Sequence, residues 1–241
     1  MRDLFWDGTV NVRDLGGLPT VTGGTTRLGS IVRSANLDNL TAAGWDSLVD
    51  YGVRTVIDLR NDHELHPPLV PRPSDVTLVR LPIDQFIGPE WYPSVCHLDG
   101  TPRIYPHYLQ DGARVVAALL TAVASAEPGG VLVHCAIGRD RTGFASMVLL
   151  HLAGVQPDAI AADYELSHER LIPFWPTIGL EDQQPPLVAA LETAGTTLRE
   201  SMLSVLSDFE PHSYLAAAGV STEIIRVIHS RLISDTPMID D

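Results

Sequence analysis

The sequence predicts an α/β fold in which a mostly parallel central sheet is flanked by helices. Short apolar, β-branched segments such as 53–59 and 131–133 alternate with longer segments whose apolar residues recur at helical spacing. That alternation is typical of βα units, which pair their strands in parallel. Polar residues follow directly after several of these strands, and ligand sites in parallel sheets lie at the carboxyl ends of strands. We therefore expect a functional site at that edge.

Composition bounds the classes of protein to consider. With 241 residues, of which 45% are hydrophobic and 19% charged, the chain can bury a substantial core, and we expect one domain over 1–241. A net charge of −14 disfavours binding to nucleic acid and to anionic membranes. No apolar segment is long enough to cross a bilayer, and the first residues lack a signal-peptide pattern. Cys96 and Cys135 alone form no disulfide framework, so a reducing cytoplasm is expected.

The first half of the chain supplies most of the predicted strands. Residues 20–26 are rich in threonine and glycine, which favours a turn between two short hairpin strands, and 28–34 is the next strand. Thr41 is suited to cap the helix that follows. Two further strands, 53–59 and 76–83, are separated by a proline-rich connector.

The second half is predicted to be mainly helical. Residues 85–103 show no periodicity, and both a flap near a pocket and an ordinary surface loop fit them. Residues 104–124 carry apolar side chains at helical spacing. Residues 168–195 are rich in proline and polar side chains and form either a lid or a plain helical insertion. Residues 196–234 are expected to be helical, and the remaining C-terminal residues a frayed tail.

The chemically richest segment is 131–144, VLVHCAIGRDRTGF. A buried strand ends at Cys135, a tight segment containing Gly138 follows, and a long apolar helix begins after it. Backbone N–H groups in such a loop, together with the helix dipole, bind anions. The guanidinium of Arg141 can bind two phosphate oxygens at once. The same positive environment favours the thiolate of Cys135, which is a nucleophile, and Thr142 is placed to donate a hydrogen bond to it.

The rest of this loop is expected to bind phosphate through its backbone amides and side chains. The residues concerned are Ala136, Ile137, Gly138, Arg139, Asp140 and Arg141. Cleavage of a phosphoester also needs a proton donor for the leaving oxygen. Asp140, inside the loop, and Asp84, at the end of the strand 76–83, are both candidates, and general-acid assignments depend on geometry that a sequence does not give.

The loop HCAIGRDRTG resembles that of a bacterial tyrosine phosphatase family, HCxxGKDRTG, within the cysteine-dependent protein tyrosine phosphatase superfamily. The segments NVRDLGG at 11–17 and Asp58-Leu59-Arg60 are also similar to that family, and the resemblance spans residues 6–170. The family includes secreted mycobacterial enzymes that act on phosphoproteins and phosphoinositides. It has lysine where this chain has Arg139, so the positive charge is kept in a different shape.

The resemblance implies a phosphomonoester hydrolase that acts through a phosphocysteine. The substrate is then a phosphorylated protein, most simply on tyrosine or with dual specificity, or a small phosphomonoester. The product is inorganic phosphate, and neither a metal nor an organic cofactor is needed. The alternatives are a phosphate- or phosphopeptide-binding module with little turnover and a phosphoinositide phosphatase. The resemblance favours Asp140 over Asp84 as general acid.

Supporting roles are expected for residues around the loop. The superfamily places a histidine, here His134, before the nucleophile to order the loop. Asp58 and Arg60 are expected to stabilise the loop that follows their strand. Asn11 and Asp14 are expected to act as scaffold, with Asp14 orienting nearby arginines and able to pair with Arg13. Contact with a ligand is considered only for Arg13, and Arg139 is expected to add positive charge on the substrate side.

Overall fold

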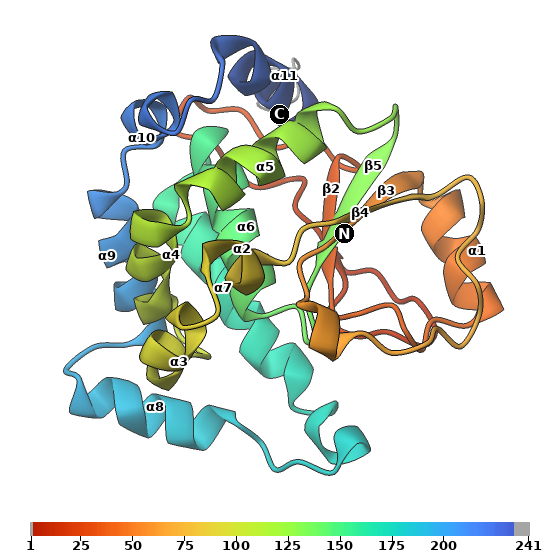
Figure 1. Ribbon diagram of the computed structural model, residues 1–241, viewed down its shortest axis with the longest axis horizontal. Coiled ribbons are helices and arrows are strands. Elements are labelled where there is room, and N and C mark those ends of the chain that lie inside the picture. The colour runs from red at the N-terminus through yellow and green to blue at the C-terminus, as the bar shows by residue number, and fades with distance from the viewer. Residues whose placement is uncertain (1, 234–241) are drawn as a thin grey trace, which may run out of the picture.

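The computed structural model describes residues 2–233, which form a five-stranded sheet with helices on both faces (Figure 1). The strands are β1 (Arg13–Asp14), β2 (Ile31–Ser34), β3 (Val53–Asp58), β4 (Thr77–Arg80) and β5 (Gly130–His134). Their order across the sheet is β1-β2-β5-β3-β4, with β5 at the centre. All neighbouring pairs are parallel except β1 with β2. The predicted α/β class with a mostly parallel sheet is confirmed.

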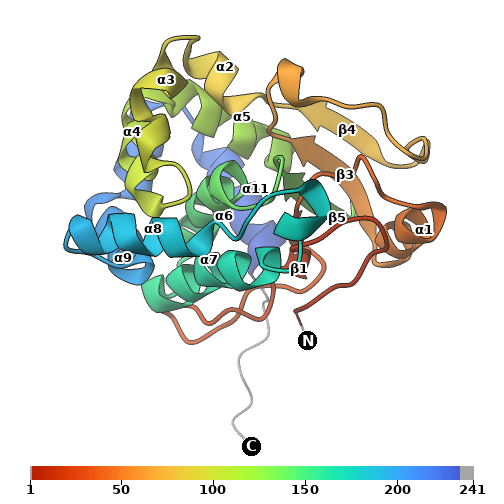
Figure 2. The same cartoon turned by 90° about the horizontal axis from the view of Figure 1, so that it is seen from below.

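Helices cover the two faces unequally. The helices are α1 (Ala42–Asp50), α2 (Ile83–Ile87), α3 (Trp91–Val95), α4 (Tyr105–Asp111), α5 (Ala113–Ala124), α6 (Asp140–Leu152), α7 (Pro157–Leu171), α8 (Gln184–Thr193), α9 (Leu198–Asp208), α10 (Pro211–Ala217) and α11 (Thr222–Leu232). Figures 1 and 2 show α1 on one side of the sheet and most other helices on the opposite side. The N-cap predicted at Thr41 is confirmed, because its hydroxyl accepts a hydrogen bond from the Gly44 amide at 3.1 Å.

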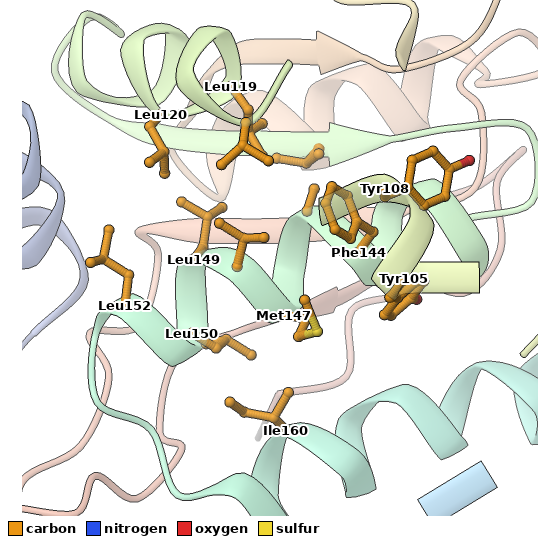
Figure 3. Close-up of a cluster of buried hydrophobic side chains, with 14 of the residues drawn as sticks. Tyr105, Tyr108, Leu119, Leu120, Phe144, Met147, Leu149, Leu150, Leu152 and Ile160 are labelled. Atoms are coloured by element: carbon orange, nitrogen blue, oxygen red, sulfur yellow. The ribbon is translucent and has the colours of Figure 1, made fainter. Parts of the chain in front are cut away.

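Successive side chains of β5 point alternately into two separate hydrophobic cores. Val131 and Val133 point into the large core formed with α5 and α6, whereas Leu132 points into a smaller core beneath α1. Figure 3 shows part of the large core, in which Phe144 and Met147 of α6 lie among side chains from the neighbouring helices. Burial on both faces fixes the register of β5, and therefore the position of the loop that follows it.

Several predicted boundaries differ from the structure for identifiable reasons. The strand predicted over 76–83 ends at Arg80, because Pro82 has no N–H to continue the ladder and instead precedes α2. The single helix predicted over 104–124 is two helices, α4 and α5, which meet at Gly112. The residues 85–103 contain α3 rather than only irregular chain.

The C-terminal part confirms its helical prediction within the described residues. The helices α9, α10 and α11 occupy most of 198–232, and Ile228 and Leu232 are buried on one face of α11. The predicted tail lies outside the described residues. Among the helices between residues 2 and 233, none is both long and apolar enough to span a membrane.

Acidification from pH 7 to pH 4 is expected to destabilise the fold, because His168 of α7 is buried as a neutral ring. Burial and the charge of Arg139 lower the pKa of His168 to about 4, against about 6.5 in the unfolded chain. Between those values the unfolded chain binds more protons, so stability falls as the pH falls through this window. The loss due to His168 is about 3 kcal/mol at pH 4.

Urea unfolding of the wild type and of His168→Gln at pH 7 and pH 4 measures this contribution. The variant is expected to lose less stability between the two pH values than the wild type, because glutamine does not titrate. The buried carboxylates titrate in both proteins and cancel in the comparison. An equal loss in both proteins would show that His168 does not contribute.

Candidate active site

The loop between β5 and α6 lies at the carboxyl end of the central strand. Cys135 follows β5 directly and is 2% exposed, and α6 begins at Asp140. Gly138 has a φ of +71°, and a Cβ atom there would lie 2.3 Å from the carbonyl oxygen of Ser34. Only glycine fits this turn, because both the backbone angle and the close approach to β2 exclude a side chain.

Side chains from other segments hold the loop from behind. The Asn11 amide donates to the carbonyl oxygens of Ile137 at 3.1 Å and Gly138 at 3.0 Å. Arg33 donates to the same Gly138 oxygen at 2.7 Å, and Asn36 donates to the oxygen of Ala136 at 2.8 Å. The loop carbonyl oxygens named here therefore already accept hydrogen bonds from side chains behind the loop. The N–H groups of the first turn of α6 have no partner within the helix, which suits them to an anion.

A buried carboxylate, Asp163 of α7, organises the arginines behind the loop. It forms ion pairs with Arg2, with Arg13 at 3.0 Å and with Arg33 at 2.8 Å. Arg13 also donates to the side-chain oxygen of Asn11 at 2.5 Å. Burial raises the pKa of Asp163, but the charges of Arg13 and Arg33 outweigh it and hold that pKa far below its ordinary value. A continuous chain of contacts thus runs from Asp163 to the loop.

The roles predicted for Asp14 and Arg13 are partly wrong. Neighbouring residues of a strand point to opposite faces, so Arg13 reaches Asp163 while the Asp14 carboxylate accepts hydrogen bonds from the Gly16 amide and the Tyr51 hydroxyl. The expected pairing of Arg13 with Asp14, and the orientation of arginines by the Asp14 carboxylate, are therefore corrected. Arg13 is 0% exposed, which also removes the expected ligand contact. Asn11 contacts the loop from behind, and its scaffold role stays a prediction.

A cavity of about 280 Å³ opens above the loop. Seven of the predicted residues line it: Asp84, Cys135, Ala136, Ile137, Arg139, Asp140 and Arg141. Six further residues that were assigned no role also line it: Asn61, His63, Glu64, Tyr92, Asp99 and Tyr108. Gly138 is absent from this lining and serves the turn instead. Because Tyr92 and Asp99 belong to the segment 85–103, that segment forms part of the cavity wall.

Arg141 is held at the cavity by carboxylates. Its guanidinium donates two hydrogen bonds to Glu64, at 2.5 and 2.6 Å, and lies 3.5 Å from Asp84. Glu64 also accepts a hydrogen bond from the backbone N–H of Asn61 at 2.8 Å. Burial raises the pKa of Glu64, but Arg141 more than offsets this and holds the pKa below its ordinary value. The planar fork of Arg141 is therefore fixed in orientation.

The two candidate acids have different surroundings. Asp84 accepts hydrogen bonds from the side-chain amide of Asn61 at 2.9 Å and from the Tyr108 hydroxyl at 2.7 Å. Asp140 accepts from the Arg139 guanidinium at 3.1 Å, and the Tyr164 hydroxyl lies 3.4 Å from its carboxylate.

Arg139 is 7% exposed, and its guanidinium carbon lies 5.9 Å from the ring centroid of Trp175. Its charge is thus directed to Asp140, and a contribution on the substrate side stays a prediction.

His134, Asp58 and Arg60 form a layer beneath the nucleophile. The His134 ring donates from Nδ1 to the Cys135 carbonyl at 3.0 Å and lies 3.9 Å from the Asp58 carboxylate. Burial lowers the pKa of His134, and Asp58 offsets this only in part. Arg60 pairs with Asp58 at 3.0 Å, and their role in stabilising the loop after this strand stays a prediction. The Thr142 hydroxyl is buried with no hydrogen-bond partner among residues 2–233, so its predicted donation to Cys135 stays a prediction.

The residues that sequence reasoning missed had only faint signals. Glu64 follows Arg60 in a polar segment with no recognisable spacing, and its contact with Arg141 joins positions 77 residues apart. Asp163 lies in a segment similar to the family, but nothing local marks it as a partner for three arginines. Tyr92 and Asp99 lie in the segment without periodicity. Across the described chain, no group of three or more histidine, cysteine or acidic residues has the geometry to hold a metal ion.

The fold and the cavity define a class of protein. A mostly parallel sheet carries a loop headed by cysteine between its central strand and a buried helix, and this is a protein tyrosine phosphatase-like fold. The chain belongs to the tyrosine phosphatase family, whose model matches residues 4–234.

Named relatives agree with this family. A provisionally named tyrosine-protein phosphatase of Cupriavidus necator is 30% identical over 218 residues, which cover 85% of this chain and 79% of the relative. A tyrosine-protein phosphatase of Nostoc commune is 32% identical over 57% of this chain and 48% of its own length. The triple specificity protein phosphatase PtpB of Mycobacterium tuberculosis is 29% identical over 67% of this chain and 68% of its own length. The chain is accordingly a phosphatase of this family, with a phosphorylated substrate and phosphate as product.

Proposed function

We propose that this protein hydrolyses phosphomonoesters, most simply phosphotyrosine in proteins, through a phosphocysteine at Cys135. The observation that carries the proposal is that Cys135 and Arg141 line one cavity at the N-terminus of α6. The family and the names of the relatives support the reaction class. The chemistry needs Cys135 reduced, and both Cys135 and Cys96 are free thiols, which fits the expected reducing cytoplasm.

In the proposed first step the Cys135 sulfur attacks phosphorus and the bond to the leaving oxygen breaks. Arg141 and the amides of residues 136–141 stabilise the negative oxygens of the transition state. Burial lowers the pKa of Arg141, but its hydrogen bonds to Glu64 and its interactions with Cys135 and Asp84 raise that pKa well above its ordinary value, so the guanidinium stays charged. Thr142 stabilises the departing thiolate when water cleaves the phosphocysteine. We retain Asp140 as the group that protonates the leaving oxygen, with Asp84 as the alternative.

The substrate is proposed from chemistry and from the relatives' names. The cavity includes two aromatic side chains, Tyr92 and Tyr108, which suits an aromatic phosphomonoester. One relative is named for triple specificity, so substrates other than phosphotyrosine, such as phosphoserine, are included as candidates. The acidic residues Glu64, Asp84 and Asp99 in the wall disfavour polyanionic phosphoinositides.

We further propose that residues 1–241 act as one phosphatase domain, in which 168–195 covers the site. Trp175 stacks on Arg139, and a Cβ atom at Gly100 would lie 2.7 Å from Leu187 of α8, so this segment touches the cavity wall from outside. Figures 1 and 2 show α8 at the periphery of the helical part. A lid at this place would limit the size of the substrate.

Hydrolysis of p-nitrophenyl phosphate and of phosphotyrosine and phosphoserine peptides, with a metal chelator present, tests the function. We expect turnover that the chelator does not reduce, with phosphotyrosine the better peptide. Binding of the peptides without release of phosphate would instead establish a binding module of the same fold. Release of phosphate from phosphoinositide vesicles but not from peptides would establish the lipid phosphatase.

Glu64→Gln is expected to lower kcat about tenfold while changing KM less than about threefold. Glutamine keeps the shape and the contact with the Asn61 amide but loses the ion pair that orients the Arg141 fork. That orientation matters most in the transition state, where the fork binds two oxygens. Steady-state kinetics with p-nitrophenyl phosphate measures the change. The control is Asp62→Asn, an exposed carboxylate that pairs with Arg80, and a loss as large in this control would contradict the assignment.

A further inference from the structure

Asp99 is a carboxylate of the cavity wall that the mechanism above does not use. It lies in the chain between α3 and α4, and its side chain lines the same cavity as Cys135 and Asp140. The Tyr92 hydroxyl donates to its carboxylate at 2.7 Å. Asp99 makes no ion pair within residues 2–233, whereas Asp84 and Asp140 each lie beside an arginine.

The backbone next to Asp99 is fixed against Asp140. The Tyr164 hydroxyl lies 3.1 Å from the carbonyl oxygen of Gly100 and 3.4 Å from the carboxylate of Asp140. Gly100 has a φ of +82°, and a Cβ atom there would lie 2.9 Å from the Arg139 guanidinium. The chain at residues 99–100 is therefore packed directly on the loop residues, and Asp99 and Asp140 line the same small cavity.

Ionisable side chains from the loop, α6 and α3 surround Asp99. Asp140, Arg139 and Arg141 belong to the loop and α6, and Tyr92 belongs to α3. Burial and the charge of Asp140 raise the pKa of Asp99 to about 6, despite the Tyr92 hydroxyl and the two arginines, which lower it. The wall also contains five further titratable side chains: His63, Glu64, Asp84, Tyr108 and Cys135.

We propose that Asp99 and Asp140 share one proton across the cavity, and that Asp99 is a positioning residue that keeps this proton available for the leaving oxygen. Two carboxyl groups that face one small space disfavour the loss of the second proton, so the pair retains a proton to higher pH than an isolated carboxyl group. The inference rests on the proposed function and deepens its acid–base step.

The proton balance of the two steps follows. As the sulfur of Cys135 bonds to phosphorus and the ester oxygen leaves, the shared proton passes from the pair through Asp140 to that oxygen, and both carboxylates are then ionised. As water attacks the phosphocysteine and the sulfur leaves, the pair accepts a proton from that water. The net reaction consumes one ester and one water and releases one alcohol and one phosphate.

The test compares pH profiles of kcat/KM for wild type and Asp99→Asn with two substrates. A phosphoserine peptide has an alkoxide leaving group that needs a proton, whereas p-nitrophenolate leaves readily without one. In the variant we expect the alkaline limb of the profile to move about one unit to lower pH. We expect the phosphoserine rate at pH 7 to fall about tenfold or more, and the p-nitrophenyl phosphate rate less than about threefold.

A second variant is expected to shift the alkaline limb of the pH profile in the opposite direction. Tyr92→Phe removes a hydrogen bond that stabilises the ionised Asp99, so the alkaline limb is expected to move to higher pH. Asp111→Asn is the matched control, because Asp111 anchors Trp91 of α3 at 2.9 Å from outside the cavity and its loss tests loosening of the wall alone. This control is expected to leave the alkaline limb in place.

The possible outcomes distinguish failure of the shared-proton inference from failure of the proposed function. A wild type that hydrolyses neither substrate would refute the function. A wild type that hydrolyses both, with an unchanged alkaline limb in Asp99→Asn or equal losses for the two substrates, would refute only the shared proton. If Asp99→Asn does not fold, Tyr92→Phe decides, because a limb that stays in place or moves to lower pH would also overturn the proposal.

Discussion

Cys135→Ser is expected to reduce hydrolysis of p-nitrophenyl phosphate by at least about 10⁴-fold. A serine hydroxyl at this position is not ionised near neutral pH, so it is a far weaker nucleophile than a thiolate. The substitution is nearly the same size and the site is 2% exposed, so the fold should tolerate it. Steady-state rates under reducing conditions, with unfolding curves for both proteins, measure the effect.

The chain contains its own matched control for this substitution. Cys96 is the other free cysteine and is exposed, so Cys96→Ser removes a thiol without touching the loop. Its rate is expected to equal that of the wild type. Phosphate is still expected to bind to the Cys135→Ser protein, because Arg141 and the loop amides remain. Activity within tenfold of the wild type in Cys135→Ser would contradict the mechanism.

Asp163→Asn is expected to lower the free energy of unfolding by about 3–5 kcal/mol, a large part of the stability of a typical domain. Asp163 neutralises three arginines, and two of them, Arg13 and Arg33, are almost fully buried. Asparagine leaves these positive charges together without a counter-charge, and burial makes that arrangement costly. Activity should fall with stability, because Arg13 and Arg33 hold the loop through Asn11 and Gly138.

Asp158→Asn, on the same helix, is the control that measures how much stability is lost with an exposed carboxylate. Asp158 pairs with Arg199, and its side chain is 78% exposed, so its loss is expected to cost less than about 1 kcal/mol. Urea unfolding at pH 7 measures both variants. Equal losses for the two variants, or a loss below about 1 kcal/mol for Asp163→Asn, would show that the cluster of arginines does not depend on this carboxylate.

The loop and its strand could be predicted from the sequence because their signals are local. The apolar run before Cys135, the glycine in the turn and the apolar helix after it lie within a few residues of one another. The β-branched segments similarly predicted the strands, although Pro82 ended β4 earlier than expected. Interactions between near neighbours are visible in a sequence because the backbone fixes their spacing.

The partners of the loop could not be predicted, because they are brought together only by the folded chain. Asp14 was expected to orient arginines, whereas the structure gives that role to Asp163, which lies 150 residues from Arg13. Glu64 and Asp99 reach the cavity from segments whose local pattern is that of ordinary polar loops. Such contacts depend on where β3 and α3 lie relative to β5, and this is set by packing in the two cores.

If catalysis passes through a phosphate bound to Cys135, trapping that intermediate tests the mechanism directly. Enzyme turning over p-nitrophenyl phosphate is quenched rapidly in acid, digested and examined by mass spectrometry for phosphorylated peptides. We expect covalent phosphate on the peptide that contains Cys135 and none on the peptide that contains Cys96. Continued turnover with phosphate on another residue, or with no phosphorylated peptide under conditions that preserve thiophosphate, would contradict it.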